Sequence, residues 1–215
     1  NVYAVGGYFF GIWPPGKKSI RSVLKVYQNL SCCHIQSYRL IHSLREKTGY
    51  NDTKVGFAHH MRIFEAKNPK NPVHVLYANV MDRLFQESIC KAFMTGDFDF
   101  PLKRPKDIVK GKYYDFIGLN YYTRSTISRF EDGVKENVPV NDLGWEIYPQ
   151  GIVVCAKRLY EQYPSPIYIT ENGTCDNEDS FRCRYIYEHL KALSESDLPV
   201  ERYYHWCFLD NFEWL

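Results

Sequence analysis

The stretch IYITENG, residues 167–173, combines a short apolar run with a carboxylate and a turn. Its first four residues are β-branched or aromatic, which is typical of a short buried strand. The Asn-Gly pair that closes the stretch predicts a tight turn immediately afterwards. Glu171 therefore stands at the carboxyl end of a predicted strand, where a side chain can face a pocket instead of bulk water.

Three other segments share this short, continuously apolar character, which predicts buried strands of a parallel sheet. Apolar residues at helical spacing lie between them and predict helices. The predicted strands are residues 55–60, 116–122, 167–170 and 203–209. The predicted helices are residues 19–47, 73–95, 151–163 and 179–196. Strand and helix alternate throughout, which favours βα units with right-handed crossovers.

This alternation favours an α/β barrel over a doubly wound nucleotide-binding sheet. The glycine-rich turns of nucleotide-binding sheets, GxGxxG and GxxxxGK[ST], are both absent from the sequence. Four predicted strands are half of the eight in a (β/α)8 TIM barrel, so we expect about half a barrel. An open half exposes two strand edges and an apolar face, which predicts self-association or pairing with the missing barrel half.

The composition is that of an ordinary folded protein and excludes disordered, collagen-like and low-complexity classes. The chain has 215 residues, 45% apolar and 24% charged, with a net charge of +2. Its only basic cluster, residues 103–112, resembles a solvated loop, and no nucleic-acid-binding module accompanies it, so we expect no nucleic-acid partner. Aromatic residues make up 16%, and flat rings suit sugar faces as well as large cores.

The cysteines and the apolar runs bear on compartment and cofactors. Seven cysteines with no CxxC pair predict free thiols in a reducing compartment, so we expect a cytoplasmic protein. No apolar run approaches the length of a membrane span, so we expect no membrane association. His59 and His60 are adjacent, but no third ligand follows at metal-binding spacing. We expect neither a metal nor a cofactor.

Polar and aromatic residues gather at the ends of the predicted strands. Position alone favours Glu171 as a surface carboxylate in a loop, but its neighbours favour a pocket. Tryptophan rings can stack on sugar faces, carboxylates and amides can bind hydroxyls, and a tyrosine can donate to an ionised carboxylate. The candidates for such a carbohydrate pocket are Asn120, Tyr122, Glu171, Trp206, Glu213 and Trp214.

Four motifs carry a resemblance to a known family. They are FIGLNYYT (116–123), GWEIYPQG (144–151), ITENG (169–173) and LDNFEW (209–214). Together and in this order they resemble the C-terminal half of a family 1 β-glycosidase, the retaining glycoside hydrolases that include β-glucosidases. The resemblance implies an α/β fold with strands 5 to 8 of a TIM barrel. It also implies that residues 1–215 are one partial catalytic domain, truncated at both ends.

The resemblance implies a role for each matching residue. Glu171 matches the nucleophile, which forms a covalent glycosyl-enzyme. Tyr122 matches the tyrosine whose hydroxyl bonds that carboxylate, and Asn120 shares its strand end. Trp206 matches the platform beneath the glycone sugar, and Trp145 matches an aromatic on the leaving-group side.

Two further matches, Glu213 and Trp214, bear on the substrate. In the family these positions bind distal hydroxyls of the glycone. A carboxylate at Glu213 would repel a 6-phosphate, so we expect unphosphorylated β-glycosides or oligosaccharides as substrates. The sequence does not distinguish glucosides from galactosides or fucosides.

The family's proton donor, a glutamate in an Asn-Glu-Pro motif, has no counterpart in the chain. By alignment on Gly7 and Tyr8, the sequence begins at the residue that should follow this motif. Glu146 and Asp210 are poor substitutes, because the first sits in a loop beside Trp145 and the second belongs to a turn. We therefore expect the chain alone to be inactive. The alternative is a non-catalytic carbohydrate-binding or assembly fragment, although such a fragment would not need Glu171 and Tyr122.

Overall fold

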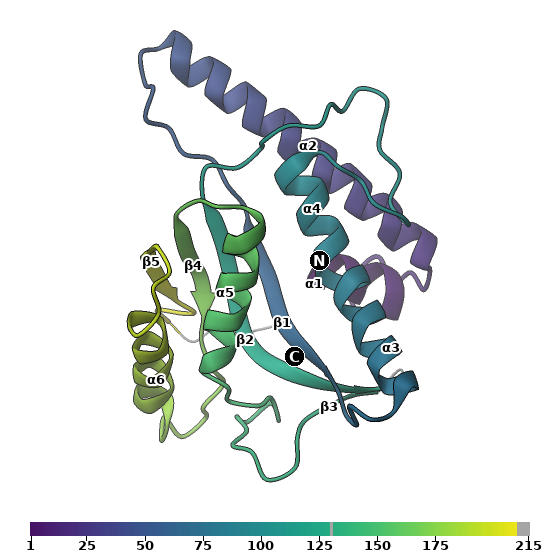
Figure 1. The fold of residues 1–215 in the computed structure, drawn as a ribbon, viewed down its shortest axis with the longest axis vertical. Coiled ribbons are helices and arrows are strands. Elements are labelled where there is room, and N and C mark those ends of the chain that lie inside the picture. Colours follow the sequence, from purple (N-terminus) through teal and green to yellow (C-terminus); the bar gives the residue numbers. More distant parts are fainter. Residues whose placement is uncertain (130, 210–215) are drawn as a thin grey trace. The chain divides into compact units, whose positions relative to one another are not determined.

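The computed structural model describes residues 1–129 and 131–209, and the chain divides into two compact units (Figure 1). The first unit comprises residues 1–60 and 79–116. The second comprises residues 61–78 and 117–215.

The first unit is helical. Its helices are α1 (Val2–Val5), the π-helix η1 (Gly6–Phe10), α2 (Ile20–Lys47), the π-helix η2 (Arg83–Glu87) and α4 (Ser88–Thr95), while α3 (Pro72–Asp82) begins in the second unit. Ser19 caps α2, because its hydroxyl accepts from the backbone N–H of Ser22 at 3.3 Å. Buried side chains of α2, Tyr27 and Ile35, share one core with Ile89 of α4. The predicted helix over 19–47 is confirmed. The predicted helix over 73–95 is also confirmed, with the π-helix η2 in its middle.

Asp115 anchors the long helix α2 to the segment before the first strand. Its carboxylate accepts from the Tyr38 hydroxyl at 2.8 Å and from the Val55 N–H at 2.7 Å. His42 Nε2 lies 2.7 Å from the second carboxylate oxygen. Burial raises the pKa of Asp115, but the hydrogen bonds from Val55, Tyr38 and His42 outweigh it and hold the pKa below its ordinary value.

The substitution Asp115→Asn should lower the free energy of unfolding by about 2 kcal/mol at about pH 7, because one partner of a charge-assisted network is weakened. A carboxyl with a lowered pKa stabilises the native state above its unfolded pKa, and this contribution is lost as pH falls through the native pKa. The difference between wild type and variant should therefore narrow below about pH 4. Urea unfolding of both proteins at about pH 7 and about pH 3 measures this. An equal difference at both pH values contradicts it.

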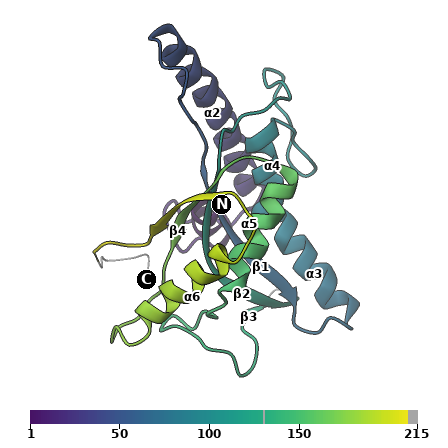
Figure 2. The ribbon, with the colours of Figure 1, turned by 60° about the vertical axis from the view of Figure 1, so that its left-hand side comes forward.

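The second unit contains the sheet (Figure 1). Its strands are β1 (Ala58–Ala66), β2 (Ile117–Ser128), β3 (Glu131–Gly133), β4 (Ile167–Asn172) and β5 (Val200–His205). The order is β1-β2-β4-β5, with β2, β4 and β5 mutually parallel and β3 antiparallel to the end of β2. Helix α5 (Gln150–Gln162) packs on β2, and α6 (Arg182–Ser194) packs on α5 (Figure 2). Among the described residues β1 and β5 do not pair with each other, so the sheet is open.

Three predicted strands have clearly different bounds in the structure. The strand predicted over 203–209 ends at His205, because the apolar residues that follow are not buried: Trp206 is 42% exposed and Phe208 96%. The strand predicted over 55–60 is displaced to 58–66. Strand β2 continues to Ser128, beyond the predicted end at 122, and its last three residues pair with β3 in a hairpin.

The two faces of β2 have different surroundings. Tyr121 is fully buried, donates to the Tyr148 carbonyl at 2.7 Å and lies 6.1 Å, ring to ring, from His189 of α6. This face of the strand is therefore covered by helices. Because side chains alternate along a strand, Asn120 and Tyr122 lie on the opposite face.

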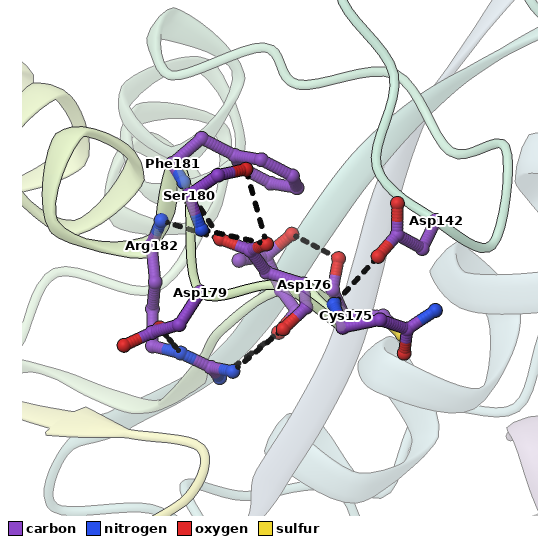
Figure 3. Close-up of polar contacts among 9 residues, drawn as sticks. Asp142, Cys175, Asp176, Asp179, Ser180, Phe181 and Arg182 are labelled. Carbon is purple, nitrogen blue, oxygen red and sulfur yellow. Dashed lines mark hydrogen bonds and ion pairs between the residues drawn. The ribbon is translucent and has the colours of Figure 1, made fainter.

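The connection from β4 to α6 is built around Asp176 (Figure 3). Its carboxylate accepts the backbone N–H groups of Ser180, Phe181 and Arg182 at 3.0, 2.7 and 2.8 Å, the donors that a helix start leaves unpaired. The Arg182 guanidinium donates to the Asp176 backbone carbonyl at 3.1 Å. The loop that follows Glu171 is thus fixed by its own hydrogen bonds.

Candidate active site

An irregularity in the sheet directs Glu171 toward Tyr122. Between β2 and β4, Leu119 pairs with Ile169, but the next pair is Asn120 with Glu171, so Thr170 is an extra residue on β4. Such a bulge turns the following side chain to the other face of the strand. Glu171 consequently shares a face with Asn120 and Tyr122.

The contacts agree with this placement. The Tyr122 hydroxyl donates to Glu171 Oε2 at 2.6 Å, a short bond typical of an ionised acceptor. Beside it, the Thr170 hydroxyl donates to Asn120 Oδ1 at 2.5 Å. Tyr122 holds one oxygen of the Glu171 carboxylate. Because Glu171 is only half-buried, solvent still reaches the residue. The predicted association of Glu171, Tyr122 and Asn120 is present in the structure.

Asn172 connects the site to the end of β5. Its amide donates to the Tyr121 carbonyl at 2.8 Å and its Oδ1 accepts from the Tyr203 hydroxyl at 2.8 Å. Its backbone carbonyl accepts the Trp206 N–H at 2.9 Å. Gly173 follows, and a Cβ there would overlap the carbonyl oxygen of Trp206. The end of β5, and with it Trp206, therefore lies beside the strand end that carries Glu171.

Trp145 meets the same face from a loop. Its ring lies 6.2 Å from that of Tyr122, edge to face. The Asn141 side chain accepts the Trp145 N–H at 2.9 Å, which closes the loop into a turn. The guanidinium of Arg62 lies 5.8 Å from the Trp145 ring, in the range of a cation–π contact.

Sequence reasoning missed Arg124. It is almost buried, and its Nε donates to Glu146 Oε2 at 2.9 Å while its Nη2 bonds Glu146 Oε1. These hydrogen bonds to Glu146 raise the pKa of Arg124 further above its ordinary value. The signal was available in the alternation of the strand, because Asn120, Tyr122 and Arg124 are two residues apart. Both oxygens of the Glu146 carboxylate are thus engaged by Arg124.

Two predicted binding residues, Glu213 and Trp214, lie outside the described residues, as does Asp210. Within residues 1–129 and 131–209 no group of three potential metal ligands gathers. In the same part of the chain, no helix is both long and apolar enough to cross a bilayer.

Comparison with known proteins agrees over the whole chain. The family profile described as "Glycosyl hydrolase family 1" matches residues 1–215. The chain is 27% identical to a Sulfolobus acidocaldarius β-galactosidase, over 100% of this chain and 46% of that protein. It is 28% identical to Thermotoga maritima β-glucosidase A, over 99% of this chain and 53% of that protein. The chain thus spans about half the length of the curated relatives it matches.

A solved structure gives the same result. The β-glycosidase from Pyrococcus horikoshii superposes with a TM-score of 0.85 at 30% identity, over 99% of this chain and 50% of that one. The predicted fold is confirmed: the open sheet with its parallel strands and helices is about half of an α/β TIM barrel. With the family profile covering every residue, the chain belongs to glycosyl hydrolase family 1.

Proposed function

We propose that this chain supplies the nucleophile of a retaining β-glycosidase, a β-glucosidase-like O-glycosyl hydrolase, with Glu171 as that nucleophile. The observation that supports it best is the 2.6 Å bond from Tyr122, in the middle of β2, to Glu171, near the carboxyl end of the parallel strand β4. A hydroxyl donor favours the ionised carboxylate and fixes its orientation, and a nucleophile needs both. Reacting groups of α/β barrels stand at these strand ends.

The proposed chemistry proceeds in two displacements. An oxygen of Glu171 attacks the anomeric carbon, the bond from this carbon to the leaving oxygen breaks, and the leaving oxygen takes its electron pair together with a proton from a second carboxyl group. Water then attacks the same carbon, gives a proton to that second group and releases Glu171. Trp206 and Asn120 are the proposed sugar contacts beside the nucleophile, and Trp145 stands on the leaving-group side.

The second carboxyl group must come from elsewhere. A retaining pair lies about 5–5.5 Å apart, and Glu146 is neutralised by Arg124. We therefore propose that the chain alone hydrolyses ordinary glycosides about 10²- to 10⁴-fold more slowly than an enzyme with both carboxyl groups. This factor is the usual contribution of general acid–base catalysis. The barrel half that this chain does not supply is the proposed source of the donor.

The proposed substrates are unphosphorylated β-glycosides or oligosaccharides, because the negative charge of Glu213 would repel a 6-phosphate. The proposed compartment is the cytoplasm, which agrees with the finding that no disulfide joins the cysteines of the described residues. Among the relatives, a β-galactosidase and a β-glucosidase match at similar identity, so the proposed substrate class is not narrowed to one sugar.

Intact mass spectrometry tests the nucleophile. Incubation with a 2-deoxy-2-fluoro-β-glucoside bearing a dinitrophenolate leaving group requires little acid assistance, because such a leaving group departs without a proton. We expect a mass increase of one fluorosugar, mapped by peptide digestion to Glu171. The variant Glu171→Gln is the control and should take no adduct. A folded chain that stays unlabelled, or an adduct on another carboxylate, contradicts the proposal; sugar binding without an adduct would favour the non-catalytic fragment.

A further inference from the structure

Arg124 and Glu146 form a buried ion pair that holds the loop before α5 against β2. Only 10% of the Arg124 side chain and 2% of the Glu146 side chain are exposed. The pair is bidentate, with two guanidinium nitrogens on two carboxylate oxygens. Two neighbours reinforce it: the Thr123 hydroxyl donates to the Glu146 carbonyl at 2.8 Å, and the Tyr148 ring lies 3.8 Å from the guanidinium.

A second carboxylate, that of Glu65, also contacts Arg124 and is itself paired with Lys135. Arg124 Nη1 donates to Glu65 Oε1 at 3.1 Å, and Lys135 Nζ lies 2.6 Å from Glu65 Oε2. Glu65 belongs to β1, so the guanidinium connects β1, β2 and the loop. A bidentate pair of this kind has a fixed geometry, which a lysine in place of Arg124 would not reproduce.

The residue beside Glu146 is Trp145, the aromatic that meets Tyr122. A peptide neighbour of a fixed side chain has little freedom, and the Asn141 N–H bonds the Trp145 carbonyl at 2.9 Å. Trp145 thereby keeps its edge-to-face contact with Tyr122, whose hydroxyl bonds Glu171. The ion pair thus lies two contacts away from the nucleophile.

We propose that Arg124 and Glu146 are positioning residues that hold Trp145 at the leaving-group side of the site. They touch no substrate themselves. This inference rests on the proposed function for its consequence: the pair should govern the affinity for the leaving group, while the reactivity of Glu171, held by Tyr122, should not depend on it. An aromatic contact of this kind raises the affinity for the leaving group about two- to tenfold.

Fluorine NMR of the chain labelled with 5-fluorotryptophan tests the position of Trp145 without any reaction. The Trp145→Phe variant assigns its resonance. In Glu146→Gln and in the double variant Arg124→Met/Glu146→Leu, we expect the Trp145 resonance to shift or broaden while those of Trp13 and Trp206 stay in place. The double variant leaves no unpaired buried charge, so it separates positioning from simple destabilisation. The control is Arg184→Met, which breaks an exposed pair with Glu188 on α6.

Labelling kinetics provide the second measurement. The concentration of dinitrophenyl fluoroglucoside that gives half-maximal labelling should rise about three- to tenfold in the double variant, with the limiting rate unchanged within about twofold. An unmoved Trp145 resonance in either folded variant overturns the proposal, and so does a shift of every tryptophan resonance together. If the unsubstituted chain takes no adduct while the Trp145 resonance still responds, the proposed function fails and the positioning role stands.

Discussion

Replacing Tyr122 with phenylalanine should slow labelling of Glu171 by the fluoroglucoside about 10- to 100-fold. The hydroxyl donates one hydrogen bond to the carboxylate at 2.6 Å, and a bond to a charged group contributes about 1.5–3 kcal/mol. Phenylalanine keeps the ring that Trp145 contacts, so the substitution removes the donor and leaves the aromatic packing. The measurement is the rate constant of adduct formation by intact mass, at saturating reagent.

The matched control is Tyr121→Phe, on the opposite face of the same strand. Its hydroxyl donates to the Tyr148 carbonyl and not to the site, so this variant should lose stability and keep its labelling rate within about twofold. Equal labelling by wild type and Tyr122→Phe would contradict the role of Tyr122. Equal losses in the two variants would show that the effect is on folding.

Local sequence pattern was sufficient to predict the strand that carries Glu171. β4 is a short run with a carboxylate near its end, and such a run is a local signal. The tight turn predicted at Asn172-Gly173 is wrong, because β4 continues through Asn172 and the next turn lies at residues 177–178. The expected proximity of Glu171 to Tyr122 also follows from topology, because the carboxyl ends of parallel strands share one edge. The resemblance to family 1 supplied the role of each residue, which the pattern alone did not contain.

Pairings between distant residues were not predictable from local pattern. Arg124 and Glu146 are 22 residues apart, and Tyr38 and Asp115 are 77 apart, so no local periodicity connects them. The bulge at Thr170 is likewise a property of two strands in register. The end of β5 was misplaced because an apolar run predicts burial only when another layer covers it, and Phe208 has no such cover among the described residues.

The substitution Gly173→Ala should both destabilise the chain and abolish labelling of Glu171. A Cβ on Gly173 would overlap the backbone carbonyl oxygen of Trp206, and a backbone atom cannot rotate away as a flexible side chain can. Either β5 shifts or the segment after Glu171 moves. Overpacking of this kind costs about 1–3 kcal/mol, and the displaced segment carries the nucleophile with it. We expect a lower free energy of unfolding in urea and a labelling rate reduced more than about tenfold.

Gly133→Ala is the matched control, because a Cβ there would meet Thr126 Oγ1 at 3.4 Å, an ordinary contact. It should change the free energy of unfolding by less than about 0.5 kcal/mol and leave labelling intact. Wild-type stability and labelling in Gly173→Ala would mean that the end of β5 is not held against Gly173. Since the backbone of Trp206 approaches the site at Asn172 and Gly173, its proposed place beneath the sugar would fail as well, whereas the bond from Tyr122 to Glu171 would be untouched.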